Sequence, residues 1–326
     1  MDFKRWMVHR TQLYLYIEEA ESGGVRLLRC YGDSPAIAVP GEIDGYPVTE
    51  IGNYCFADSA RAREAPKRPD GTRSLSGEYL QQVELPDTVK KLGNLAFYNC
   101  KNLQELCFGI NLTEVGSDAF MNCRLLHRFR ITGNMRQGTG LKQLLAQRMC
   151  SMDVFFVEGQ RIVGRLFYPE YEEYHDEIGP AHIFAMSIRG EGFRARQCFR
   201  EGLVSLRDYD EIFEQACAEE SAETLCRLAG SRLAYPVDLE EIPEQRYREY
   251  LQEHQEVLAA VLVEEQEIET LRQFAAGNIL SGEGLQMAAS MASRKEWVQG
   301  TAEILKLQRQ KLQETPKTER YTFEEW

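Results

Sequence analysis

The sequence predicts an α+β protein with three successive parts: a solenoid of short stacked repeats, a middle segment that contains a β-hairpin, and an all-α domain of helical repeats. Three observations predict this order. Residues 80–131 repeat with a period of 23 residues, which is typical of a solenoid. Residues 153–167 alternate apolar and polar side chains around a Glu-Gly turn, as a hairpin does. Beyond residue 207, apolar residues recur at helical spacing.

The 23-residue repeat aligns without gaps. Residues 80–102 read LQQVELPDTVKKLGNLAFYNCKN, residues 103–125 read LQELCFGINLTEVGSDAFMNCRL, and the first strand starts a third time at residue 126. Each copy begins with a short strand that has apolar side chains on one face, and Gly93 is expected to permit a tight bend. One copy is too small to hold a core alone, so the copies must stack.

A further copy lies upstream, at residues 39–56, and it carries five extra residues before the shared ending. Phe56 takes the place of Phe97, but the two are 41 residues apart, which exceeds one period by 18. The excess is rich in Arg, Lys, Pro, Gly and Ser, and it predicts an inserted surface loop at about residues 59–77. Phe56, Phe97 and Phe120 are therefore expected to form one buried ladder.

The string LPDTVKKLGNLAFYNCKNL resembles the BspA-like leucine-rich repeat of bacterial proteins, and VPGEIDGYPVTEIGNYCF resembles the first repeat of such arrays. The residues before it resemble the hairpin that caps them. The resemblance covers about residues 10–131. It implies an N-terminal capping hairpin at residues 1–38, a leucine-rich-repeat solenoid at residues 39–131, a strand-lined face and a role in binding. It implies no chemistry.

Residues 132–206 are predicted to be a middle segment that caps the solenoid or links it to the rest of the chain. Asp153–Val157 and Arg161–Phe167 are the expected strands of its hairpin, which would cover the open edge of the solenoid. The stretch at residues 169–182 is acidic and rich in Tyr, and a loop is expected there. Residues 183–206 give no prediction.

Residues 207–313 are predicted to be a helical domain, followed by a tail at residues 314–326. The charge changes at this boundary. Residues 1–206 hold 25 Lys and Arg against 26 Asp and Glu, whereas residues 207–326 hold 13 against 25. The last helices resemble degenerate ankyrin repeats, although the TPLH signature of those repeats is absent.

Composition bounds the functions to consider. The net charge of −13 argues against affinity for nucleic acid or for an anionic membrane. The N-terminal stretch lacks the apolar core of a secretory signal, and the longest apolar run, Val257–Val263, is far shorter than the roughly 20 residues that span a bilayer. The nine cysteines contain no CxxC pair, so they are expected to be reduced thiols in a cytoplasmic protein without structural zinc.

Sites for catalysis or cofactors were sought in the middle segment. His175 and His182 flank an acidic pair, but a separation of seven residues suits no helix or strand face, so a solvated acidic loop is expected. Cys198 with His175 could form a nucleophile and base, a pairing that arises by chance in a chain this long. The RGEGFRAR segment at residues 189–196 could cradle a phosphate, but a turn with solvated arginines is favoured. No catalytic residue, metal ligand or cofactor is therefore predicted.

Three functions remain open at this stage. The first is an intracellular protein–protein interaction scaffold or adaptor of bacterial type, without catalysis and with a protein partner that the sequence does not identify. The second is a surface adhesin-like binding protein that is exported without a classical signal. The third is an enzyme with a site in residues 132–206.

The strand alternation nominates a binding face. Val83 and Leu85 point inward in the first strand, so their neighbours must point outward, and one period later the same holds for the next copy. The outward positions form two rows that run from acidic to basic, a surface that solenoids commonly use for binding. The predicted binding residues are Gln82, Glu84, Glu105, Cys107, Arg128 and Arg130.

Overall fold

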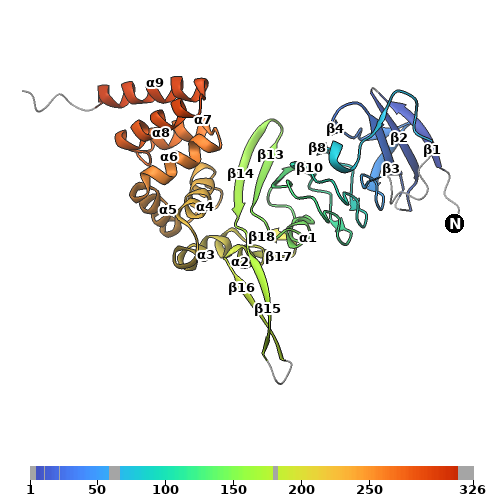
Figure 1. Ribbon diagram of the computed structural model, residues 1–326, viewed down its shortest axis with the longest axis horizontal. Coiled ribbons are helices and arrows are strands. Elements are labelled where there is room, and N and C mark those ends of the chain that lie inside the picture. The colour runs from blue at the N-terminus through green and yellow to red at the C-terminus, as the bar shows by residue number, and fades with distance from the viewer. Residues whose placement is uncertain (1–4, 11, 22, 59–66, 179–182, 315–326) are drawn as a thin grey trace, which may run out of the picture. The chain divides into compact units, whose positions relative to one another are not determined.

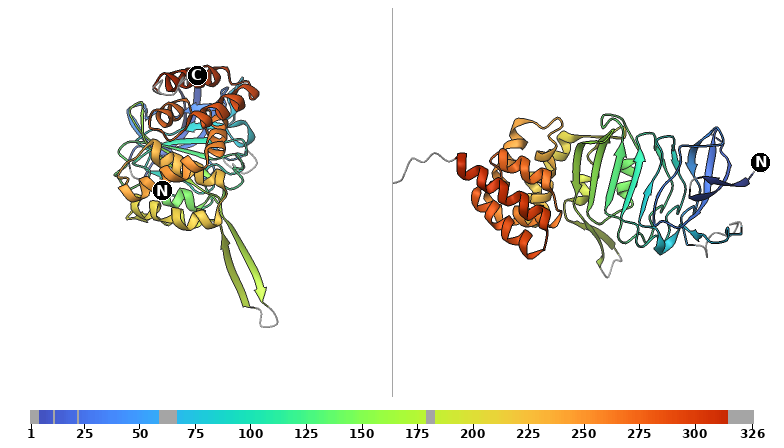
Figure 2. Two further views of the ribbon diagram at one scale, coloured as in Figure 1. Left: turned by 90° about the vertical axis from the view of Figure 1, so that its left-hand side faces the viewer. Right: turned by 90° about the horizontal axis from the view of Figure 1, so that it is seen from above.

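The structure is a computed structural model, and it describes residues 5–10, 12–21, 23–58, 67–178 and 183–314. It divides into two compact units, Met1–Glu219 and Glu220–Trp326. The first unit is a β-solenoid whose strands follow one another as successive rungs, and the second consists of helices (Figures 1 and 2). The predicted α+β fold, with a solenoid of stacked repeats ahead of a helical region, is confirmed.

One sheet of the first unit begins with an antiparallel meander and continues as a parallel stack. Its strands, in spatial order, are β1 (Arg5–Arg10), β2 (Leu13–Glu19), β3 (Val25–Gly32), β6 (Tyr46–Ile51), β9 (Lys91–Leu92) and β11 (Glu114–Val115). The N-terminal segment thus covers the first rung of the solenoid, because β3 pairs in parallel with β6.

The opposite sheet of the solenoid contains one strand from each rung. Its strands, in spatial order, are β4 (Ala36–Ala38), β8 (Gln82–Glu84), β10 (Glu105–Gly109), β12 (Arg128–Thr132), β13 (Met152–Glu158) and β14 (Arg161–Tyr168). The pairs from β4 to β13 are parallel, and only β13 and β14 pair in antiparallel fashion. The predicted hairpin therefore closes this edge of the stack, with Gly159 at positive φ in its turn.

Three phenylalanine rings stack between the two sheets. The ring centroids of Phe56 and Phe97 are 4.8 Å apart, and those of Phe97 and Phe120 are 5.6 Å apart. All three side chains are buried. The predicted ladder is confirmed, and it shows that each rung shares its core with the rungs above and below.

The glycine of the repeat has a different role from the expected one. Gly93 has no positive φ, and a Cβ there would lie 2.5 Å from the backbone nitrogen of Asn53 in the rung below. A Cβ on Gly116 would likewise lie 2.5 Å from the backbone nitrogen of Asn94. The left-handed backbone falls two residues later, at Leu95 in this copy. Glycine is needed because the rungs touch at this point, and not because the chain bends there.

The extra residues of the first copy form a hairpin of their own. Strand β5 (Glu42–Ile43) pairs with β6 across Asp44 and Gly45, which both have positive φ. The loop expected at about residues 59–77 is only partly described, since residues 59–66 lie outside the described residues. The remainder includes β7 (Arg73–Ser74), which pairs with β3, so this part is more regular than the sequence suggested.

The prediction of a loop at residues 169–182 is wrong for its described part. Strand β15 (Glu172–Ile178) pairs with β16 (Ile183–Arg189) in a two-stranded hairpin that projects from the first unit (Figures 1 and 2). The acidic strand is held by the apolar strand that follows it, and a reading of the acidic strand alone could not detect that pairing.

The remaining elements of the first unit are short, apart from its last helix. They are α1 (Leu141–Ala146), the 3-10 turn Gly77–Tyr79, α2 (Gly192–Ala195), β17 (Phe199–Arg200), β18 (Leu203–Val204) and α3 (Leu206–Glu219). Helix α3 begins where the helical region was predicted to begin, but it belongs to the first compact unit. Tyr209 of α3 donates a hydrogen bond to the backbone oxygen of Phe167 on β14.

The second unit contains six helices among the described residues. They are α4 (Ala222–Ala234), α5 (Glu241–Glu253), α6 (Gln255–Glu264), α7 (Ile268–Ala276), α8 (Gly282–Arg294) and α9 (Val298–Glu314). Helices α4, α6 and α8 pack successively against one another, and α9 packs on α8 and α7. Ser221 and Ser281 cap α4 and α8 through their side-chain oxygens. Among the described residues, no helix combines the length and apolar character that crossing a bilayer requires.

The phenylalanine ladder can be tested by removing its middle ring. We expect Phe97→Ala to lower the free energy of unfolding by about 3–5 kcal/mol, the usual cost of deleting a buried ring. Tyr46→Ala is the matched control, because Tyr46 is 56% exposed and its loss should change stability by less than about 0.5 kcal/mol. Chemical denaturation measures both. Equal stability of the two variants would contradict the ladder.

Candidate binding face of the parallel sheet

The predicted binding residues lie on the outer face of the sheet that runs from β4 to β14. Val83, Leu106 and Phe129 occupy the middle of successive strands, and all three are completely buried. The strands pair residue for residue at the 23-residue offset. The flanking residues of each strand therefore point to the other face and line up across the sheet.

The first row consists of Gln82, Glu105 and Arg128, which are direct neighbours in the pairing register. Gln82 Nε2 donates to Glu105 Oε1 at 3.0 Å, and Arg128 Nη1 lies 3.4 Å from Glu105 Oε2. The guanidinium of Arg128 also lies over the ring of Phe155, 5.4 Å from its centroid. This row is thus an internally connected network, and Arg128 is half-buried within it.

The second row consists of Glu84, Cys107 and Arg130. Cys107 is 7% exposed, and burial, followed by the charge of Glu84, raises the pKa of its thiol to about 11. Arg130 opposes this rise. Glu84 and Arg130 make no ion pair with any described residue, which distinguishes this row from the first. Two unpaired opposite charges thus lie two strands apart, with a buried thiol of raised pKa between them.

The same face continues onto the hairpin, and sequence reasoning missed this continuation. Phe155 lies beside Arg130 in the register and has Arg165 over its ring, at 5.0 Å from the centroid. Arg165 forms a buried ion pair with Asp153, with distances of 3.1 and 2.8 Å to Oδ1. Alternation within β13 could have nominated Asp153 and Phe155, but only the parallel pairing with β12 adds them to the rows.

The residues considered for catalysis do not assemble into a site among the described residues. Cys198 is buried, and burial raises the pKa of its thiol to about 12, so the thiolate that a nucleophile requires is disfavoured. Its sulfur donates to the backbone oxygen of Arg194. The backbone of His175 belongs to β15, but its side chain is outside the description, and His182 lies outside the described residues altogether.

Arg196 departs from the expected solvated turn. It is almost fully buried, and its guanidinium donates to the backbone oxygens of Leu145, Cys150, Pro169 and Gly192 at 2.6–3.3 Å. Burial lowers the pKa of Arg196. This arginine joins three segments of the middle region. Its guanidinium is bound by backbone oxygens, so it does not form the phosphate cradle considered for residues 189–196. The neighbouring Arg194 pairs with Glu191 at 3.6 Å.

Within the described part of the chain, no group of three His, Cys, Asp or Glu side chains has the geometry to hold a metal ion. The cysteines are separate thiols, and those of Cys100 and Cys123 donate to backbone oxygens of the rung below.

Comparison with known families matches the solenoid. Residues 70–139 fit the sequence model of the family described as BspA type leucine rich repeat region (6 copies). The chain carries a BspA-type leucine-rich repeat region. This match includes β8, β10 and β12, the three strands that hold all six predicted binding residues.

Leucine-rich repeat solenoids typically serve as binding scaffolds. No curated protein and no solved structure matches the chain, and the likeness of the last helices to ankyrin repeats stays a prediction.

The two arginines that end the rows should respond differently to charge reversal. Arg128→Glu places a carboxylate beside Glu105 and removes the contact with Phe155, so we expect a loss of about 1–2 kcal/mol of stability. Arg130→Glu breaks no ion pair among the described residues, and its effect should stay within about 0.5 kcal/mol. Thermal and chemical unfolding of both variants measures this difference. An equal loss in both would show that the rows are wrongly assigned.

Proposed function

We propose that this protein is a binding scaffold that presents the outer face of its parallel sheet to another protein. The observation that carries the proposal is the second row, where Glu84 and Arg130 have no ion-pair partner among the described residues. In the first row, by contrast, Glu105 and Arg128 pair with each other. Glu84 is exposed and Arg130 is half-buried. Unpaired charges at a fixed spacing on a rigid surface can select the orientation and identity of a partner.

We further propose that the protein works inside the cell as an adaptor of bacterial type. All nine cysteines are free thiols in the structure, and six of the eight in the first unit are buried. Solenoid proteins that work in oxidising compartments can use closely stacked cysteines as disulfides, whereas reduced buried thiols suit a reducing compartment. In the alternative of an exported adhesin, the outer face of the parallel sheet would bind its partner outside the reducing compartment.

We propose no catalysis and no partnership with nucleic acid or membrane. The two residues of the middle segment that catalysis would need have structural roles instead. Cys198 is buried, which raises the pKa of its thiol, and Arg196 binds backbone oxygens. The net charge of −13 disfavours polyanionic partners in general. The partner that fits best is therefore another protein.

The compartment proposal predicts the redox state of the protein from its native host. We expect nine reduced thiols by mass spectrometry after trapping under non-reducing conditions. In timed labelling at pH 7.5, the exposed Cys217 should react first. Cys107 should react slowly, because a pKa near 11 leaves little thiolate at that pH. A native disulfide would favour the adhesin alternative and contradict the adaptor.

The face itself is tested by exchanging its two unpaired charges. We expect Glu84→Arg/Arg130→Glu, which keeps the net charge, to abolish capture of the protein that the wild-type chain retains from a host lysate. The matched control is Lys91→Glu/Glu114→Lys on the opposite sheet, where the exchange preserves an exposed ion pair. Quantitative mass spectrometry of the captured protein compares the three. Unchanged capture by the first variant would place the binding site outside this face.

A further inference from the structure

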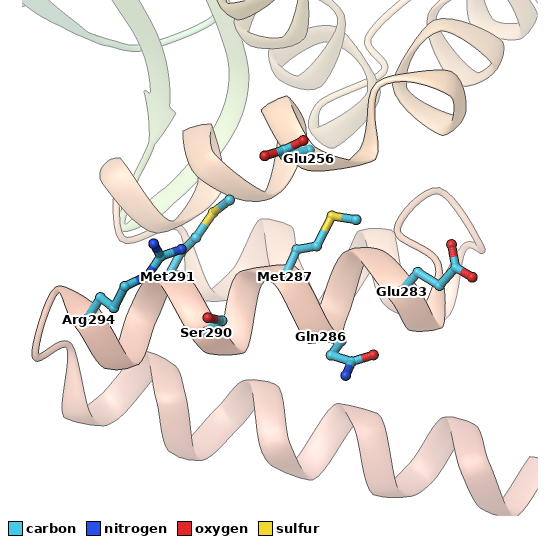
Figure 3. A pocket seen from close by; sticks show the side chains of 7 residues that line it. All are labelled: Glu256, Glu283, Gln286, Met287, Ser290, Met291 and Arg294. Carbon is cyan, nitrogen blue, oxygen red and sulfur yellow. The ribbon is translucent and has the colours of Figure 1, made fainter.

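A groove in the second unit is lined by six side chains of α8 and by Glu256 of α6, and Figure 3 shows these side chains. The two helices start side by side: Gln255 at the start of α6 donates to the backbone oxygen of Ile279 and accepts from the backbone nitrogen of Ser281. The groove encloses about 480 Å³ and is open to one side. It lies entirely within one compact unit, far along the chain from the strand face.

Two methionines form the apolar part of this groove. Met287 and Met291 are one turn apart on α8; Met287 is 37% exposed and Met291 is half-buried. Methionine side chains are flexible and polarizable, so they adapt to the shape of an inserted apolar group.

The charges around the methionines are polarised along the groove. Glu256 and Glu283 lie in the first turns of α6 and α8, and Arg294 lies in the last turn of α8. These positions also suit the helix dipoles. However, none of the three makes an ion pair with a described residue, whereas the nearby Arg272 and Lys295 both do. Along α8 the lining thus runs from the acidic Glu283 to the basic Arg294, with the two methionines and the polar Gln286 and Ser290 between these ends.

We propose that this groove binds an amphipathic helix of a partner protein, with basic side chains at one end and a carboxylate at the other. The walls of the groove are helices, whose backbone groups are already paired within each helix. An extended segment would find no backbone partners there, whereas a helix satisfies its own backbone and binds through side chains. From Glu283 to Arg294 the groove is about 16 Å long, which matches about three turns of a bound helix.

The binding mode follows from this arrangement. Two apolar side chains one turn apart on the incoming helix insert beside Met287 and Met291. Lys or Arg at one end of that helix approaches Glu256 and Glu283, and Asp or Glu at its other end approaches Arg294. This site is independent of the strand face, so it extends the proposed function to a second partner or to a second segment of the same partner.

A designed peptide tests the proposal on the full chain. The probe is a fluorescein-labelled, Ala-rich 14-residue helix with two Lys in its first turn, two Leu one turn apart in the middle, and one Glu in its last turn. We expect saturable binding by fluorescence anisotropy. Glu256→Lys/Glu283→Lys should weaken it about tenfold. A second peptide with Glu in place of the two Lys should bind this variant as well as the first peptide binds wild type.

Two controls separate the groove from general electrostatics and from folding. Glu240→Lys/Glu241→Lys makes the same charge change at the start of α5, outside the groove, and should leave the affinity for the first peptide unchanged. Circular dichroism confirms that each variant is folded. The proposal is overturned if the first peptide shows no saturable binding up to about 1 mM, if both double variants weaken it equally, or if the second peptide fails to recover binding. None of these results depends on Glu84 or Arg130.

Discussion

The parallel register between β8, β10 and β12 is the constraint on which the rest of the first unit depends. Each strand pairs with the next at an offset of 23 residues, so equivalent side chains stack in columns. A slip of one residue would exchange the inner and outer faces of a strand, removing Val83 or Leu106 from the core. The buried phenylalanine ladder and the close contact at Gly93 hold successive rungs together from inside, with ring centroids 4.8 and 5.6 Å apart in the ladder.

This register also creates the face proposed to bind a partner. Because outer residues stack as strictly as inner ones, a gradual change from acidic to basic residues in the repeats becomes an ordered row of charges across the sheet. The hairpin of β13 and β14 extends the rows and ends the stack in antiparallel pairing, with Arg165 held between Asp153 and Phe155. The face therefore combines a rigid, internally bonded row with a neighbouring row that keeps Glu84 and Arg130 available.

The second unit offers a different kind of surface. The backbone N–H and C=O groups of its helices are hydrogen-bonded within each helix. The proposed recognition there therefore depends on side chains that line the groove. The sheet face presents charges at fixed spacing, whereas the groove beside Met287 presents adaptable apolar side chains between charged ends. The two surfaces suit different partner shapes, since one is broad and rigid and the other is narrow and able to adjust.

The sequence by itself determined the features that arise from periodicity. The 23-residue repeat was sufficient to predict the stacking of Phe97 on Phe120 and the outward columns, because a solenoid converts sequence offsets directly into spatial neighbours. The ending that the upstream copy shares with the repeat was enough to add Phe56 to the ladder. Contacts between segments without a common period needed the tertiary structure. The pairing of β15 with β16 and the carbonyl ligands of Arg196 were of this kind. So was the groove between α6 and α8, because it depends on how two helices pack and not on any pattern within either one.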